Sequence, residues 1–116
     1  MVNSTVIEMK NLRKIVPMNT KQLAKVMKAL SHPNRLEIYL EIAKKHEASY
    51  QAENDECYVS DIMSCLNIGA PTISHHLKEL TNADLIVTER RGKFVIAKIN
   101  QETMQQVKQA LGIKAE

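Results

Sequence analysis

One segment near the C-terminus breaks the helical spacing of apolar residues found in most of the chain. Residues 86–88 read Ile-Val-Thr and residues 94–99 read Phe-Val-Ile-Ala-Lys-Ile, with Glu-Arg-Arg-Gly-Lys between them. Runs rich in β-branched residues on both sides of a glycine are typical of two strands joined by a tight turn. The sequence therefore predicts a β-hairpin in a mainly helical protein, and the tip of this hairpin carries three cations, Arg90, Arg91 and Lys93.

Two short helical segments precede the hairpin, separated by Asn67-Ile68-Gly69. Apolar residues at helical spacing mark both segments: Val59, Ile62, Met63 and Leu66 in the first, Ile73, Leu77 and Leu80 in the second. Pro71 suits the first turn of the second segment, because a proline there removes no helical hydrogen bond. Two short helices around a glycine turn are typical of a helix-turn-helix motif.

Helical spacing also predicts helices in residues 1–17, in residues 19–30 and after Pro33, as well as a last helix capped by Asn100. The helix after Pro33 is expected to bury one face, made of Leu36, Tyr39, Leu40 and Ala43. Residues 44–56 lose this spacing and become polar. They are therefore predicted to form a surface loop.

Length and composition limit the function classes that the chain can serve. Its 116 residues suit one domain, and the core must be aliphatic, because Trp is absent and the aromatic residues are three Tyr and one Phe. The net charge is only +3, so any affinity for nucleic acid depends on where the cations lie. No apolar run could span a membrane and no secretion signal is visible, so we expect a cytoplasmic protein. Neither a glycine-rich phosphate loop nor a nucleophile with its base is present, so neither catalysis nor a cofactor is expected.

Two segments of the chain resemble signatures of the ArsR/SmtB family of bacterial and archaeal transcription regulators. Residues 23–36, LAKVMKALSHPNRL, look like the opening signature of the family, and residues 71–80, PTISHHLKEL, look like its recognition helix. The resemblance covers roughly residues 20–111. It implies a winged helix-turn-helix fold, mainly α, with five to six helices and a two-stranded wing.

The resemblance implies a repressor that binds double-stranded DNA. The recognition helix would enter the major groove and the wing would follow phosphates or enter the minor groove. The residues expected at the DNA are Thr72, Ser74, His75, His76 and Lys78 from the helix, and Arg90, Arg91 and Lys93 from the wing. Two alternatives stay open: a solvated helix face with a tip that keeps the hairpin soluble, and a protein-interaction module that binds no operator.

A homodimer is also implied, because in the family the first and last helices pack across a twofold axis. The candidate interface residues are apolar and lie on those helices: Leu12, Leu23, Met27, Met104, Val107 and Leu111. The alternative is that the same residues close the core of their own protomer. By this interpretation residues 1–18 are a helical extension that packs in the dimer, residues 19–112 bind DNA and residues 113–116 are a tail.

The sequence gives little sign of an effector. Metal-sensing relatives carry a Cys-x-Cys pair where this chain has Tyr58-Val59-Ser60-Asp61, or Asp and His on the last helix, where residues 100–116 have neither. No metal site is therefore expected. Cys57 and Cys65, on either side of the first helix of the motif, are possible sensing thiols or simply two ordinary thiols.

Overall fold

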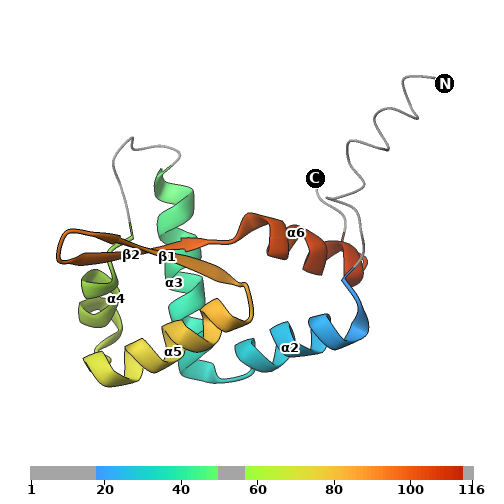
Figure 1. Ribbon diagram of the computed structural model, residues 1–116, viewed down its shortest axis with the longest axis horizontal. Helices are drawn as coiled ribbons and strands as arrows, with labels where there is room; N and C mark the ends of the chain where they lie inside the picture. Colours follow the sequence, from blue (N-terminus) through green and yellow to red (C-terminus); the bar gives the residue numbers. More distant parts are fainter. Residues whose placement is uncertain (1–17, 50–56, 114–116) are drawn as a thin grey trace, which may run out of the picture.

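The computed structural model describes residues 18–49 and 57–113. In chain order these residues form α2 (Thr20–Leu30), α3 (Pro33–Ser49), α4 (Val59–Leu66), α5 (Ala70–Asn82), β1 (Ile86–Arg91), β2 (Phe94–Ile99) and α6 (Gln101–Ala110). In Figure 1, α3 stands between two groups of elements, with α4, α5 and the hairpin on one side and α2 and α6 on the other. The mainly helical fold with one hairpin confirms the prediction from the sequence.

Local sequence signals set several helix ends. Asn19 caps α2 by accepting a hydrogen bond from the Gln22 backbone N–H at 2.8 Å, and the Gln22 side chain accepts one from the Asn19 N–H. Asn100 accepts one from the Thr103 N–H and so caps α6, as predicted. Pro33 begins α3, also as predicted. These caps satisfy backbone donors that a helix start otherwise leaves without partners.

Two expectations for α3 are wrong. The helix runs to Ser49, so residues 44–49 are helical and not part of a loop. Lys, Glu and Ala in that stretch favour a helix by propensity alone, without an apolar face. The buried face holds Ile38, Tyr39 and Ile42, while Leu36 and Leu40 are exposed. Both sets have helical spacing, so the sequence pattern could not tell which one would be covered.

The two strands pair in an antiparallel register from Ile86 opposite Ile99 to Arg91 opposite Phe94. The pairing extends through Arg91, so Gly92 and Lys93 form the tight turn that the sequence predicts. The segment before α4 joins the other edge of β2. There the Cys57 carbonyl accepts a hydrogen bond from the Ala97 N–H at 2.9 Å, and Tyr58 forms a single bridge to Ile96.

The core is aliphatic, as the composition predicts. Its largest fully buried side chains come from α3, α4, α5, the turn after α5 and the two strands: Ile38, Ile42, Ile62, Ile73, Leu80, Leu85, Ile86 and Ile96. Val26 of α2 and Val107 of α6 are also buried and extend this cluster toward the other side of the molecule. The helix-turn-helix and the hairpin are thus held by one shared core.

Replacing Gly92 by alanine is expected to destabilise the hairpin by about 1 kcal/mol. Gly92 has a φ of +62°, and no atom lies within 4 Å of the position a Cβ would take, so the penalty is conformational and not steric. Urea unfolding measures the loss. Gly92→Asn is the control, because asparagine tolerates left-handed backbone and should lose less; an equal loss in both variants would contradict this explanation.

Candidate nucleic-acid interface

Helix α5 has one buried face and one polar face. Ile73, Leu77 and Leu80 point into the core, whereas Thr72, Ser74, His75 and Lys78 are exposed, as expected for residues that read DNA. The helix begins after Gly69, which has no side chain to cap it. The positive end of the helix dipole therefore points outward beside Thr72, a geometry that favours an anion.

His76 does not belong to the polar face, unlike the other α5 residues that the sequence predicts at the DNA. Only 3% of its surface is exposed, because it lies three residues after Ile73 on the buried side of α5. Arg35 Nε donates a hydrogen bond to His76 Nδ1 at 3.4 Å, and Arg35 Nη1 donates to the Ala29 carbonyl at 3.3 Å. The rings of His32 and His76 have centroids 4.7 Å apart.

The environment of His76 keeps its ring neutral. Burial lowers its pKa below the usual value, and the neighbouring charges of His32, Arg35 and His75 lower it further. A neutral ring can accept the Arg35 hydrogen bond at Nδ1. Arg35 and His76 therefore link α5 to the junction between α2 and α3.

The hairpin presents its cations in two directions. Successive side chains of a strand point to opposite faces, so Arg90 shares a face with Thr88 while Arg91 shares one with Glu89. Glu89 Oε2 lies 3.1 Å from an Arg91 guanidinium nitrogen and 3.7 Å from Lys98 Nζ. Arg90 forms no ion pair with any residue that the structure describes, and Lys93 Nζ lies 5.8 Å from the centre of the Phe94 ring. Arg90 and Lys93 are therefore the more available cations.

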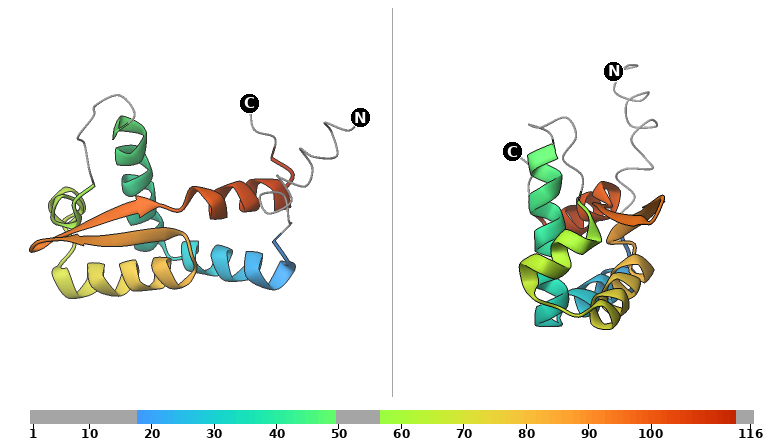
Figure 2. Two further views of the ribbon diagram at one scale, coloured as in Figure 1. Left: turned by 45° about the horizontal axis from the view of Figure 1, so that its top comes forward. Right: turned by 90° about the vertical axis from the view of Figure 1, so that its left-hand side faces the viewer.

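A groove of about 360 Å³ separates α5 from the hairpin. Figures 1 and 2 show the hairpin running beside α5, at the end of the molecule away from α2 and α6. The groove is lined by Val59, Ser74, Leu77, Lys78, Thr81, Asn82, Thr88 and Val95. It joins two predicted contact residues, Ser74 and Lys78, to three polar residues that the sequence analysis missed, Thr81, Asn82 and Thr88. Thr81 follows Ser74 at helical spacing, which was the available signal.

The candidate dimer residues divide into three groups. Met27 and Leu111 are exposed large apolar side chains, and Leu23 and Met104 are partly buried against the core. Val107 is buried at 5% exposure inside its own protomer, as in the alternative that these residues close the core of their own protomer. Leu12 lies outside the described residues. The two exposed candidates thus lie on α2 and at the end of α6.

The two cysteines differ in access. Cys57 is buried beside β2, whereas Cys65 is exposed on α4 with its Sγ 3.7 Å from Glu41 Oε1. No disulfide joins them. Residues 18–49 and 57–113 contain no group of three His, Cys, Asp or Glu side chains arranged to hold a metal ion. No helix in those ranges has the length and apolar character to cross a bilayer.

Two repressors have sequences that align with most of this chain. A helix-turn-helix domain family matches residues 30–89. The arsenical resistance operon repressor of Staphylococcus xylosus is 30% identical over 96 residues, which are 83% of each chain. The transcriptional repressor SdpR of Bacillus subtilis (strain 168) is 34% identical over 80 residues, 69% of this chain and 78% of that one.

Solved structures share the fold. An ArsR family transcriptional regulator superposes with a TM-score of 0.65 at 19% identity, covering 83% of this chain and 89% of that one. A homodimeric winged helix-turn-helix DNA-binding domain from Mycobacterium bovis superposes with a TM-score of 0.60 at 24% identity, covering 80% of this chain and 77% of that one. The hairpin beside α5 is therefore the wing, and α4 and α5 are the helix-turn-helix. Sequence and fold together show that the chain belongs to the ArsR family of winged helix-turn-helix transcriptional regulators.

Proposed function

We propose that the protein is a cytoplasmic, homodimeric repressor that binds a palindromic operator. The observation that carries the proposal is the groove between α5 and the hairpin, where Ser74 and Lys78 of the exposed face of α5 meet Thr88 of β1. The uncapped start of α5 and the turn of the hairpin lie at the same end of the molecule (Figure 1). Two repressors among its relatives, from Staphylococcus xylosus and Bacillus subtilis, support this function.

In this proposal α5 enters the major groove. Thr72, Ser74 and His75 contact base edges or phosphates near the start of the helix, and Lys78 reaches the backbone one turn later. Arg90 and Lys93 contact phosphates or the minor groove from the wing. Arg91 contributes less than Arg90, because Glu89 already offsets part of its charge.

The homodimer supplies the second half of the binding site. One protomer has one recognition helix and reads one half-site, so a twofold dimer reads a palindrome with half-sites about 34 Å apart. Met27 and Leu111 are the exposed apolar residues offered for the interface, and the Mycobacterium bovis domain with the same fold is described as homodimeric.

The signal that releases the operator is not specified by this interface. A thiol signal would act first at Cys65, because Cys57 is buried and becomes accessible only when the contact between its segment and β2 opens.

Fluorescence anisotropy with DNA from the promoter of its own gene, against random DNA at physiological salt, tests the proposal. Arg90→Ala and Lys93→Ala should each weaken binding to all sequences and lower the salt slope by about 1. His75→Ala should also change the sequence preference. Arg91→Ala removes the same charge as Arg90→Ala and should lose less affinity.

The proposal fails if the purified protein shows no preference for its promoter. A stoichiometric protein partner that stays bound at high salt, in the absence of operator binding, would instead favour the protein-interaction module.

A further inference from the structure

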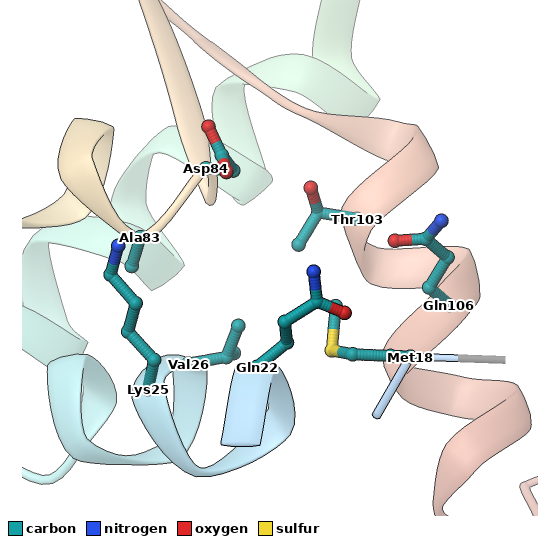
Figure 3. A pocket seen from close by; sticks show the side chains of 8 residues that line it. All are labelled: Met18, Gln22, Lys25, Val26, Ala83, Asp84, Thr103 and Gln106. Atoms are coloured by element: carbon teal, nitrogen blue, oxygen red, sulfur yellow. The ribbon is translucent and has the colours of Figure 1, made fainter. Parts of the chain in front are cut away.

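A second cavity, of about 310 Å³, lies on the side of the molecule away from the wing. It lies between α2 and α6 and is bordered at one end by the turn that follows α5 (Figure 3). Its lining residues come from these three elements and from the residue before the N-cap of α2: Met18, Gln22, Lys25, Val26, Ala83, Asp84, Thr103 and Gln106. The DNA interface uses none of them.

The lining carries one positive and one negative charge. Lys25 lies on α2 and Asp84 follows α5, and neither forms an ion pair with any described residue. Both side chains are exposed at the cavity. The two charges cancel, so the cavity does not select for a simple anion or cation. It favours a ligand that carries both signs.

Neutral polar groups of the lining are also available. The Thr103 side chain extends from α6 toward the cavity (Figure 3), only 6% of the residue is exposed, and its hydroxyl has no hydrogen-bond partner in the described structure. Buried hydroxyls in proteins nearly always have a partner. The Gln22 carbonyl oxygen is held by the Asn19 N–H, which leaves its amide nitrogen to donate, and Gln106 offers a second amide.

We propose that this cavity binds a small zwitterion of the size of a free α-amino acid. Lys25 receives the carboxylate, Asp84 receives the ammonium group, and Thr103 and Gln106 hydrogen-bond to the ligand. Met18, Val26 and Ala83 provide an apolar wall for a short side chain. The volume is at the lower end of the range of about 300–1,000 Å³ found for ligand pockets, which excludes large ligands.

The position of Asp84 connects the cavity to the recognition helix. Asp84 has a φ of +60°, its N–H donates to the Thr81 carbonyl at 3.0 Å, and the next N–H, of Leu85, donates to the Leu80 carbonyl. The Leu85 carbonyl in turn accepts the Asn100 N–H at the start of α6. A ligand held by α2, α6 and Asp84 therefore fixes the end of α5 relative to the two helices of the proposed dimer.

Dimer contact and ligand binding use different faces of α2. Met27 lies about 140° around the helix from Gln22, given 3.6 residues per turn. A partner that covers Met27 therefore leaves the cavity side of α2 accessible. By fixing the end of α5, the bound ligand changes the affinity of the dimer for its operator. This regulatory step rests on the proposed function, since it requires an operator.

Thermal unfolding with each of the twenty standard amino acids at about 10 mM tests the site without DNA. A ligand present at about ten times its Kd should raise Tm by about 5 °C. Lys25→Met and Asp84→Asn should abolish the shift; asparagine retains the left-handed backbone, so this variant removes only the charge. Lys21→Met, on α2 outside the cavity, should retain it. The proposal is overturned if no amino acid raises the Tm of the natural chain. It is also overturned if the shift persists in Lys25→Met and Asp84→Asn.

Thr103→Val separates ligand binding from folding. Valine has nearly the same shape without the unpartnered hydroxyl, so the unliganded variant should be as stable as the natural chain or more stable, with a ligand-induced shift at most half as large. A marked loss of Tm without ligand would show that the hydroxyl has a structural partner and contradict its assignment.

Addition of the ligand should then change the operator Kd at least fivefold. An unchanged Kd with an intact thermal shift would refute the regulatory step alone, whereas absent operator binding in every condition would refute the proposed function and leave the thermal test of the site valid.

Discussion

The Ile73→Ala variant is expected to unfold with a free energy about 2–5 kcal/mol lower than the natural chain. Ile73 is 1% exposed and lies between Thr72 and Ser74, so it is the core residue nearest the reading end of α5. Truncation removes buried apolar surface and leaves a space that the neighbouring side chains fill only in part. Urea unfolding at constant pH measures the loss, with an unchanged dependence on denaturant showing that the unfolded state is unaffected.

Two controls distinguish anchoring from recognition. Ile73→Val removes one methylene group and should lose only about 0.5–1.5 kcal/mol. Thr72→Ala, at the exposed neighbour, should change stability by less than about 0.5 kcal/mol while weakening operator binding. If Thr72→Ala destabilised the fold as much as Ile73→Ala, the assignment of the two faces of α5 would be wrong.

The fold was predictable where its signals are local. Pro71 and the spacing of Ile73, Leu77 and Leu80 predicted α5, and β-branched runs beside Gly92 predicted the wing. Each of these signals lies within a few residues and needs no knowledge of a partner. In α3, by contrast, two apolar stripes compete, and only tertiary packing selects the one that contains Ile38 and Ile42.

The site was less predictable because its decisive contacts join distant parts of the chain. His75 and His76 look alike in sequence, but one residue is about 100° around a helix. That rotation leaves His75 exposed and brings His76 against Arg35, 41 residues away. The burial of Cys57 likewise depends on a distant contact, because its segment pairs with β2.

The groove beside the hairpin and the cavity between α2 and α6 were equally hard to predict from the sequence. The groove places Thr88 of the hairpin opposite α5, and the cavity brings together α2, α6 and the turn at Asp84. Polar residues at such positions follow no short motif. Only the packing of the helices shows that they share a space.

Acid is expected to destabilise the protein through His76. The folded pKa of His76 is lowered, mainly by burial, so below about pH 6.5 the unfolded chain binds a proton that the folded chain does not. The stability that His76 contributes is therefore complete above about pH 6.5 and is lost as the pH falls toward the folded pKa. One proton limits this slope to about 1.4 kcal/mol per pH unit.

Urea unfolding at several values between about pH 7.5 and 5 measures this slope, and His76→Asn identifies its source. The Asn carbonyl can take the place of Nδ1 as acceptor for Arg35 but does not titrate. The variant should be less stable than the natural chain at neutral pH, because it fills less of the buried site, but it should lose less stability on acidification. His32→Asn, which removes the neighbour with the largest electrostatic effect on the His76 pKa, should flatten the slope only in part. If the natural chain and His76→Asn lost stability equally on acidification, the acid sensitivity would belong to other groups. Arg35 would then anchor α5 without any contribution from the titration of His76.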